Sequence, residues 1–446
     1  MVIYLQILRC YVCALNANLR KGTPPVNLES RNIMNPTKDL DTHDGVPLRI
    51  CMVTPFPPRH DGIATYSSDL IGAMERYGHT VYVISHTDEQ VGGHESQTNV
   101  FGIIDISKPD WERVIFDKIM DLKPDVVHIQ HEYGLYANAG DYGISIIDLL
   151  FLLFVARVPA VITYHSVYST LSREEAIFTS LSLDTVDAGI VHEEFQKIFL
   201  PANLGRIPNN VYVIPHGAKA VVAEDVPDVR EAKRQAGYEG KKVVLCVGWW
   251  EPNKRFEDVV TIWPDILEKA KNAVLIIAGD ARPGSPSGLY YKPKLLKAIR
   301  ESSVKDQIRV ITGAFTPKEY DSILNLADLV VLPYDRASQS GNLAHAFALG
   351  KPAVVTAVEG LKAEVEASQA GATVPLGSLE DLKAALLLLL RNNELRELFS
   401  QRALEYVQKK IGWSIVAQKH ILLYKIAVQK ERMKVTPTAG LDISRG

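Results

Sequence analysis

Small polar residues gather between an apolar strand and a helix near residue 340, and their order suits the binding of an anion. The apolar run 329–332 leads into the loop 333–341, which ends in Ser340 and Gly341, and an apolar helical stretch follows. Free backbone N–H groups and the positive end of the helix dipole make such a helix start a site for phosphate. An ordinary strand-to-helix loop is the alternative, and this loop alone leaves both interpretations open.

Two other loops have the same order of strand, turn and helix. Gly62 follows the strand 49–54 and a Pro-rich turn, and Gly248 begins a loop that runs to Lys254 after the strand 243–247. A glycine at such a turn lets the backbone approach a ligand closely, because it has no Cβ. The chain therefore contains three candidate phosphate-binding loops.

The elements that must position these loops alternate along the chain. Apolar runs of strand length recur from residue 49 to 214, separated by helical patterns, and the same alternation repeats from residue 243 to 356. Near-continuous apolar strands alternating with helices predict parallel sheets covered on both faces. With 446 residues and 47% apolar content, the chain exceeds one hydrophobic core, and two domains are expected. Ligands of such sheets bind beyond the carboxyl ends of the strands.

Composition excludes several classes of function. The net charge of −3 and the absence of a Lys/Arg run with interleaved aromatics argue against nucleic-acid binding. Cys10 and Cys13 have the spacing of a metal pair but lack a second pair, whereas Cys51 and Cys246 sit in apolar runs and are expected in the core. No stretch is long and apolar enough to span a membrane. A reducing, cytoplasmic setting fits four such cysteines.

Two common nucleotide motifs are missing. No strand is followed by Gly-x-Gly-x-x-Gly, so a nicotinamide dehydrogenase is disfavoured. Gly350-Lys351 is followed by Pro352, and the position that a Walker loop would fill with glycine holds His345.

In order, the landmarks resemble the retaining sugar-nucleotide transferases of glycosyltransferase family 4. The resemblance covers roughly residues 48 to 430, and its landmarks are the Gly62 loop, His131-Glu132, Ile214-Pro215-His216-Gly217, the loop 248–254, the strand 275–280 and Gly350-Lys351-Pro352. No single landmark is specific, but the ordered set is.

The resemblance implies an α/β GT-B fold, in which two Rossmann-like domains face each other across a cleft. We expect a disordered N-terminal extension over 1–47, within which Met34 is an alternative start, and an acceptor domain over 48–222. A nucleotide-sugar-binding domain over 240–409 and a C-terminal helical segment over 410–432 follow, with 219–240 as the linker.

The implied activity is transfer of a hexose from a nucleotide-diphosphate sugar to a hydroxyl acceptor, with retention of configuration. No cofactor or metal ion is expected. The expected partners are the nucleotide sugar and a carbohydrate, lipid-linked or small-molecule acceptor, with cytoplasmic localisation that allows peripheral contact at the inner membrane face. A sugar-nucleotide epimerase on the same scaffold and a catalytically silent sugar-nucleotide-binding subunit are the alternatives.

Family positions suggest individual roles. His131 would hydrogen-bond the donor sugar, and Lys254 would stabilise the charge that develops on the departing diphosphate. The family places an Arg where this chain has Trp249, so Arg255 is a candidate substitute. The remaining candidates fall in two groups: Gly62, Ser340, Gly341, Asn342 and His345 for the donor nucleotide, and Arg59, Asp61 and His165 for the acceptor.

One departure from the family pattern is sharp. Alignment on Gly350-Lys351-Pro352 places Ala337 and His345 where two glutamates normally contact the donor hexose and the nucleotide ribose. Those contacts must come from other groups, and His345 is our candidate for the ribose.

Overall fold

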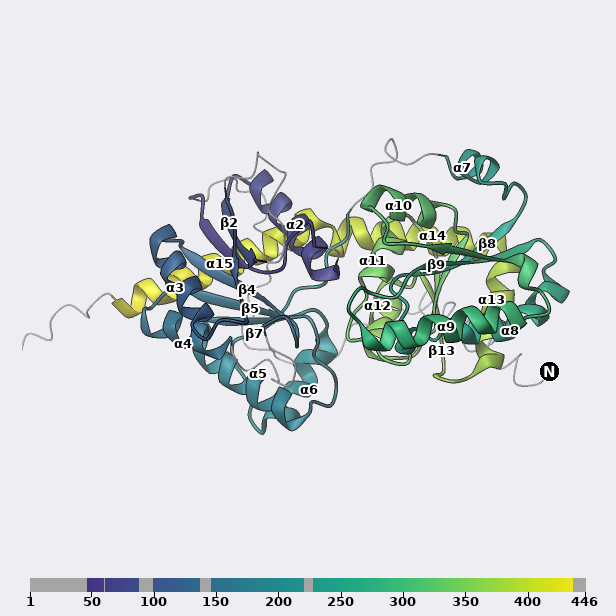
Figure 1. Cartoon of the computed structure of the whole chain (residues 1–446). Helices are drawn as coiled ribbons and strands as arrows, with labels where there is room; N and C mark the ends of the chain where they lie inside the picture. Colours follow the sequence, from purple (N-terminus) through teal and green to yellow (C-terminus); the bar gives the residue numbers. More distant parts are fainter. Residues whose placement is uncertain (1–45, 60, 88–98, 137–145, 220–227, 436–446) are drawn as a thin grey trace, which may run out of the picture. The chain divides into compact units, whose positions relative to one another are not determined.

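The computed structural model describes residues 46–59, 61–87, 99–136, 146–219 and 228–435 (Figure 1). Residues 47–446 form one unit, which holds two parallel sheets with flanking helices. We call residues 47–219 the N-terminal half and 228–412 the C-terminal half. The predicted α/β fold with two Rossmann-like halves is confirmed, whereas Cys10, Cys13, Met34 and most of the predicted extension lie outside the described residues.

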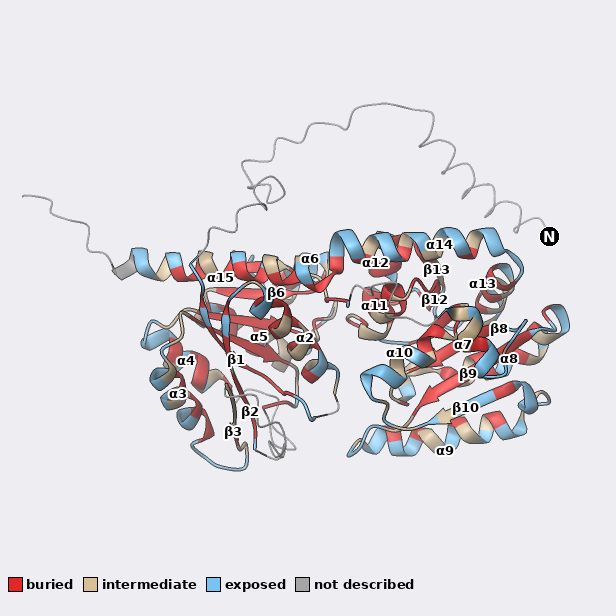
Figure 2. Cartoon of the chain, turned by 90° about the horizontal axis from the view of Figure 1, so that it is seen from above, coloured by how far each residue is buried: buried red, intermediate tan, exposed pale blue. Residues whose placement is uncertain are grey.

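The sheet of the N-terminal half has seven parallel strands in the order β3-β2-β1-β4-β5-β6-β7. Central strands are buried on both faces, as a parallel sheet between helices requires, although β4 carries the polar residues His128, Gln130 and His131 (Figure 2). The strands are β1 (Arg49–Val53), β2 (Thr80–His86), β3 (Val100–Ile104), β4 (Val126–His131), β5 (Ala160–Tyr164), β6 (Ala188–Val191) and β7 (Val211–Val213).

In the described part of this half, five helices begin after strand ends. Two of them have clear side-chain caps: Asp61 accepts from an amide in the first turn of α2, and Ser172 forms a capping box with Glu175 at the start of α5. The helices are α2 (Gly62–Arg76), α3 (Trp111–Leu122), α4 (Ile147–Val155), α5 (Arg173–Thr185) and α6 (Glu194–Leu204).

The C-terminal half repeats the plan with six parallel strands in the order β10-β9-β8-β11-β12-β13. Its strands are β8 (Lys242–Val247), β9 (Ala273–Gly279), β10 (Ile308–Thr312), β11 (Leu329–Leu332), β12 (Ala353–Thr356) and β13 (Gly371–Val374). Its helices are α7 (Val229–Gln235), α8 (Phe256–Lys269), α9 (Pro286–Glu301), α10 (Pro317–Asn325), α11 (Gly341–Ala348), α12 (Glu359–Ser368), α13 (Leu379–Arg391) and α14 (Asn393–Tyr406), with short helical turns η2 (Pro252–Lys254) and η3 (Lys305–Gln307).

After α14 the chain returns to the N-terminal half. A π-helical turn, η4 (Val407–Ile411), leads to α15 (Trp413–Val435), which packs on α2 and against β4 and β5. The Tyr424 hydroxyl lies 2.5 Å from Nδ1 of the buried His128 on β4. At the crossing, the Trp413 ring fills the space beside Gly217, where an added Cβ would come within 2.2 Å of it. The last helix therefore completes the N-terminal half.

Three predictions of local structure were wrong. The strands β3 and β13 were missed because both lie at sheet edges, where residues are only partly buried and the apolar pattern is weak. The predicted linker contains α7, whose first turn is capped by Asp228. In α13, the apolar run 386–390 is predicted from the sequence to pack inward; Leu386 and Leu389 are buried, but Leu388 is 47% exposed because it falls on the opposite side of the helix.

Candidate active site

His131 ends β4 and is buried, and one of its ring nitrogens has no hydrogen-bond partner within the described residues. Its ring stacks on Phe178 at 4.2 Å, and that nitrogen is Nε2. Burial lowers the pKa of His131 to about 3, so the imidazole is neutral at physiological pH. A buried polar atom without a partner costs about 1–3 kcal/mol. Nε2 is therefore unpaired among the described residues but enclosed by protein, and its contact with the donor sugar, which would require this atom to become accessible, stays a prediction.

Further histidines follow the next strand ends. His165, His192 and His216 come after β5, β6 and β7, and their rings lie 4.9, 5.5 and 5.0 Å from the ring of Tyr66 on α2. Register explains part of this cluster, because His131 on β4 pairs with Tyr164, so the strand ends are level. The sequence pattern included His216 only within a family landmark and gave no role to His192, although the place of His192 after an apolar strand is a usable signal.

His165 has protein partners for both ring nitrogens. Its Nε2 lies 2.8 Å from Oε1 of Gln130, and its Nδ1 lies 3.4 Å from Nε2 of His192. Burial lowers the pKa of His165 well below its usual value. The residue therefore reaches an acceptor only by giving up one of these contacts, and its predicted acceptor role remains untested.

The Gly62 loop leads into the start of α2, where the glycine is exposed. Asp61 accepts from the Ala64 amide at 2.7 Å and pairs with Arg59 at 2.6 Å, so the two predicted acceptor residues hold each other. Gly62 is exposed, and an added Cβ would meet nothing within 4 Å. Packing therefore does not demand glycine here, and the close approach of a ligand to Gly62 stays a prediction.

Glu132, directly after His131, was missed as a site residue. One carboxylate oxygen accepts from the Ser166 hydroxyl at 2.5 Å and the other from the Tyr133 amide at 3.0 Å. Burial raises the pKa of Glu132 to about 6, although these hydrogen bonds and the charge of Arg282 act in the opposite direction. A carboxyl that titrates near neutrality at a strand end is a candidate functional group.

Lys254 ends the loop after β8 and stays half-buried. Its Nζ lies 3.7 Å from the centre of the Tyr334 ring, and no carboxylate of the described residues pairs with it. Burial lowers the pKa of Lys254 to about 8, the nearby Arg282 adds to the decrease, and Glu251 opposes it. An ammonium without a counter-ion, desolvated at a strand end, suits an anionic ligand.

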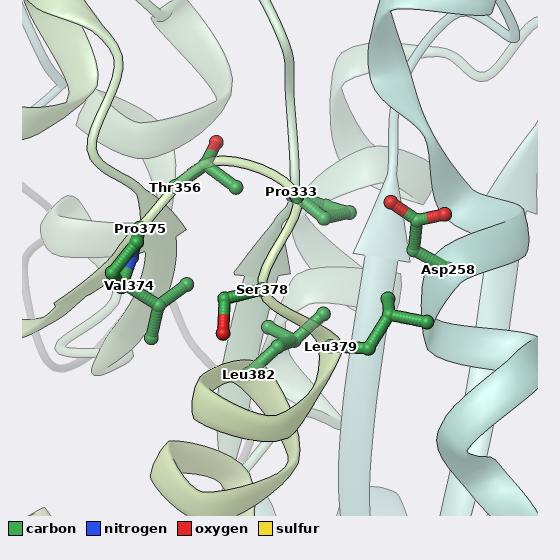
Figure 3. Close-up of a pocket in the computed structure, with 9 residues that line it drawn as sticks. Asp258, Pro333, Thr356, Val374, Pro375, Ser378, Leu379 and Leu382 are labelled. Carbon is green, nitrogen blue, oxygen red and sulfur yellow. The ribbon is translucent and has the colours of Figure 1, made fainter.

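Arg255 has a partner within the protein. It adopts a left-handed backbone conformation with φ of 49°, and its guanidinium forms two hydrogen bonds with the Asp258 carboxylate, of 2.8 and 2.9 Å. Asp258 also lines a cavity of about 10 Å³, which has room for about one water molecule. Figure 3 shows this cavity between the ends of β11, β12 and β13 and the start of α13, and none of the predicted site residues lines it. The donor role of Arg255 stays a prediction.

The predicted phosphate loop does begin a helix. Ser340 caps α11 and accepts from the Leu343 amide at 3.3 Å, which leaves the first amides of the helix to a ligand. A Cβ added to Gly341 would lie 3.6 Å from Nε2 of His216. The side chain of Asn342 is fully used, because it donates to Val247 and Tyr334 and accepts from Tyr320. Only backbone groups of Asn342 remain for a diphosphate.

His345 lies one turn further along α11. It is half-buried, its ring centre is 5.7 Å from that of Tyr320, and no hydrogen bond of its side chain is found in the described part of the chain. Burial lowers the pKa of His345, so the ring is a neutral donor or acceptor. The predicted ribose contact is compatible with this geometry and is not tested by it.

The segment before α11 touches the N-terminal half directly. The Ser338 hydroxyl donates to the His165 carbonyl at 3.0 Å, and the Gln196 amide donates to the Ser338 carbonyl at 3.5 Å. Nearby, the Ser169 amide donates to Glu359 at 3.1 Å. The candidate donor loop is therefore in direct contact with the N-terminal half beside the histidine cluster.

Within the described residues, no group of three or more His, Cys, Asp and Glu side chains is arranged to hold a metal ion. None of the helices that the structure describes is both long enough and apolar enough to cross a bilayer.

Comparison with known proteins agrees with this arrangement. The Glycosyltransferase Family 4 model matches residues 60–220, and the model of Glycosyl transferases group 1 matches residues 228–406. The chain belongs to glycosyltransferase family 4. This family-4 chain is 22% identical over 325 residues to alpha-monoglucosyldiacylglycerol synthase of Streptococcus pneumoniae, covering 67% of the chain and 68% of that protein. An uncharacterised glycosyltransferase of Methanocaldococcus jannaschii is 23% identical, over 86% of the chain and 99% of its own length.

Solved structures show the GT-B fold. Sucrose-phosphate synthase of Thermosynechococcus elongatus superposes with a TM-score of 0.70 at 16% identity, over 86% of the chain and 100% of that structure. Anabaena HepE in complex with UDP superposes with a TM-score of 0.66 at 15% identity, over 85% of the chain and 100% of that structure. The family-4 chain is therefore a glycosyltransferase with a GT-B fold.

Proposed function

We propose that the protein transfers a hexose from a nucleotide-diphosphate sugar to a hydroxyl acceptor, with retention of configuration. The observation that carries this proposal is the half-buried ammonium of Lys254, which lacks a carboxylate partner among the described residues and stands at the carboxyl end of β8. The capped start of α11 supplies amides for the same anion. HepE has been solved with UDP and with UDP-glucose, which supports a nucleotide sugar as donor.

In the proposed reaction, the bond between the anomeric carbon and the diphosphate oxygen breaks, and its electron pair goes to the diphosphate. The acceptor oxygen forms the new glycosidic bond and loses its proton, which the released diphosphate takes up. Lys254 and the α11 amides stabilise the charge that develops on the leaving group. The neutral His131 ring positions the sugar through Nε2. This scheme requires no cofactor beyond the donor.

A lipid-linked or carbohydrate acceptor fits the proposal, together with cytoplasmic residence and contact with the inner membrane face. Two relatives carry lipid acceptors in their names, alpha-monoglucosyldiacylglycerol synthase and a phosphatidyl-myo-inositol mannosyltransferase of Mycobacterium leprae. On α4 of this chain, Phe151, Phe154 and Val155 are all more than half exposed. Co-sedimentation with vesicles, compared with a variant carrying serine at these three positions, tests the membrane contact.

The direct test of the function is product analysis. The protein is incubated with UDP-glucose or GDP-mannose and a panel of lipid and sugar acceptors, and products are identified by mass spectrometry. Proton NMR of the product then gives the anomeric configuration, which must match that of the donor. A protein that binds the donor but neither transfers nor hydrolyses it would be a silent binding subunit, the alternative that the absence of glutamate at Ala337 and His345 favours.

A further inference from the structure

This chain has Trp249 where the family pattern leads us to expect a cation beside the diphosphate. Trp249 is half-buried and carries no charge, so a second cation for the leaving group would have to come from another element. The candidates are the cations near the Gly248–Lys254 loop, which differ in their ion pairs.

Most of these cations are already engaged by the protein. Arg255 pairs with Asp258 through two hydrogen bonds, and Lys292 pairs with Asp280 at 2.6 Å. The guanidinium of Arg336 lies 3.7 Å from the centre of the Tyr168 ring. Each of these side chains would have to release a protein partner before it could turn to a diphosphate.

Arg282 differs because it is exposed and forms no ion pair within the described residues. Its place is fixed by the backbone. The Gly248 amide donates to Ala278 at 3.1 Å, and the Trp250 amide donates to Asp280 at 2.8 Å, so the loops after β8 and β9 are joined. Arg282 follows Asp280 by two residues and therefore stands beside the loop that ends in Lys254.

Arg282 also acts electrostatically on both halves of the protein. Its charge adds to the lowering of the pKa of Lys254 and opposes the raised pKa of Glu132. Such effects require the guanidinium to approach Lys254 of the C-terminal half and Glu132 of the N-terminal half. Two neighbouring cations without counter-ions repel each other, and an anion bound between them relieves the repulsion.

We propose that Arg282 is the second cation of the donor site and binds the departing diphosphate together with Lys254. The inference rests on the proposed function. It places the missing positive charge on the loop after β9 instead of the loop after β8, where Trp249 stands.

The test compares Arg282→Gln, which removes the charge, with Arg282→Lys, which keeps it. Arg300→Gln is the matched control, because Arg300 is exposed near the end of α9 and forms no ion pair in the described part of the chain. We expect Arg282→Gln to lower kcat/KM about 10- to 100-fold, below the full effect of losing a preorganised donor because the side chain is exposed. Arg282→Lys should restore most of the activity, and the control should match wild type.

Two further measurements separate this role from a structural one. Calorimetric titration with UDP and GDP should show weaker binding to Arg282→Gln at an unchanged melting temperature. The alkaline limb of its pH–rate profile should move to higher pH, because a cation beside Lys254 has been removed.

The outcomes are distinct. Wild-type kcat/KM and nucleotide affinity in Arg282→Gln, with a loss in a Lys254 variant, would overturn the Arg282 role and leave the proposed function standing. A charge-specific loss in Arg255→Gln without one in Arg282→Gln would assign the role to Arg255 instead. If the wild-type protein neither binds a nucleoside diphosphate nor transfers sugar, the proposed function fails and this inference fails with it.

Discussion

Replacement of Lys254 by alanine removes the charge that carries the proposed function. A unit charge about 4 Å from another contributes about 4 kcal/mol at an effective dielectric constant of about 20. Only the part that develops between ground state and transition state accelerates the reaction, so we expect a loss of about 2–4 kcal/mol. This corresponds to a decrease in kcat of about 30- to 900-fold.

The assay measures initial rates at saturating acceptor over a range of donor concentrations. Lys254→Met keeps the aliphatic stem against Tyr334 and removes only the charge, so it separates packing from electrostatics. Lys271→Ala is the matched control. Lys271 is exposed and precedes the amino end of β9, whereas Lys254 follows the carboxyl end of β8. Kinetics of Lys254→Met equal to those of wild type would refute the argument, since the cation would then have no part in the reaction.

Three other predictions follow from the site. His345→Ala should weaken nucleoside diphosphate binding by about 1–2 kcal/mol through loss of one hydrogen bond, and equal dissociation constants by calorimetry would exclude the ribose contact. Gly217→Ala should lower the free energy of unfolding, measured in urea, by about 1–3 kcal/mol because its Cβ would overlap Trp413. Gly62→Ala should leave stability unchanged and lower activity. Unchanged activity of Gly62→Ala would remove Gly62 from the site. Because the pKa of Lys254 is about 8, its ammonium is charged below that pH, so the rate should fall about tenfold per pH unit above it. A flat pH–rate profile of the wild type would contradict this role of Lys254. Lys254→Arg should flatten the profile, because arginine keeps its charge.

The sequence predicted where the candidate residues lie relative to the strands. His131 and Lys254 were proposed from family positions, and the structure places them at the end of β4 and in the loop after β8, where ligands of parallel sheets bind. Ser340 was identified as the start of a helix from its local sequence pattern, and the structure shows it as the cap of α11. Local patterns were sufficient for these placements.

Residues whose function depends on contacts between distant segments were not predicted. Glu132 becomes a candidate only because folding buries its carboxylate, and Arg282 only because the loops after β8 and β9 are joined. The pairing of Arg255 with Asp258 did have a local signal, since opposite charges three residues apart at the start of a helix attract each other. That spacing was in the sequence and was not used.

The absence of glutamate at position 337 has a physical reason in the packing of its loop. Ala337 is buried, and its carbonyl accepts from the Gly360 amide at 3.1 Å at the start of α12. An added Cβ on Gly360 would lie 2.2 Å from the Ser338 carbonyl, so the loop and the helix meet backbone to backbone. A glutamate at the buried position 337 would have to bury its carboxylate, which is costly unless the charge is paired. The next residue, Ser338, donates to the His165 carbonyl, so this buried loop also joins the donor side to the N-terminal half.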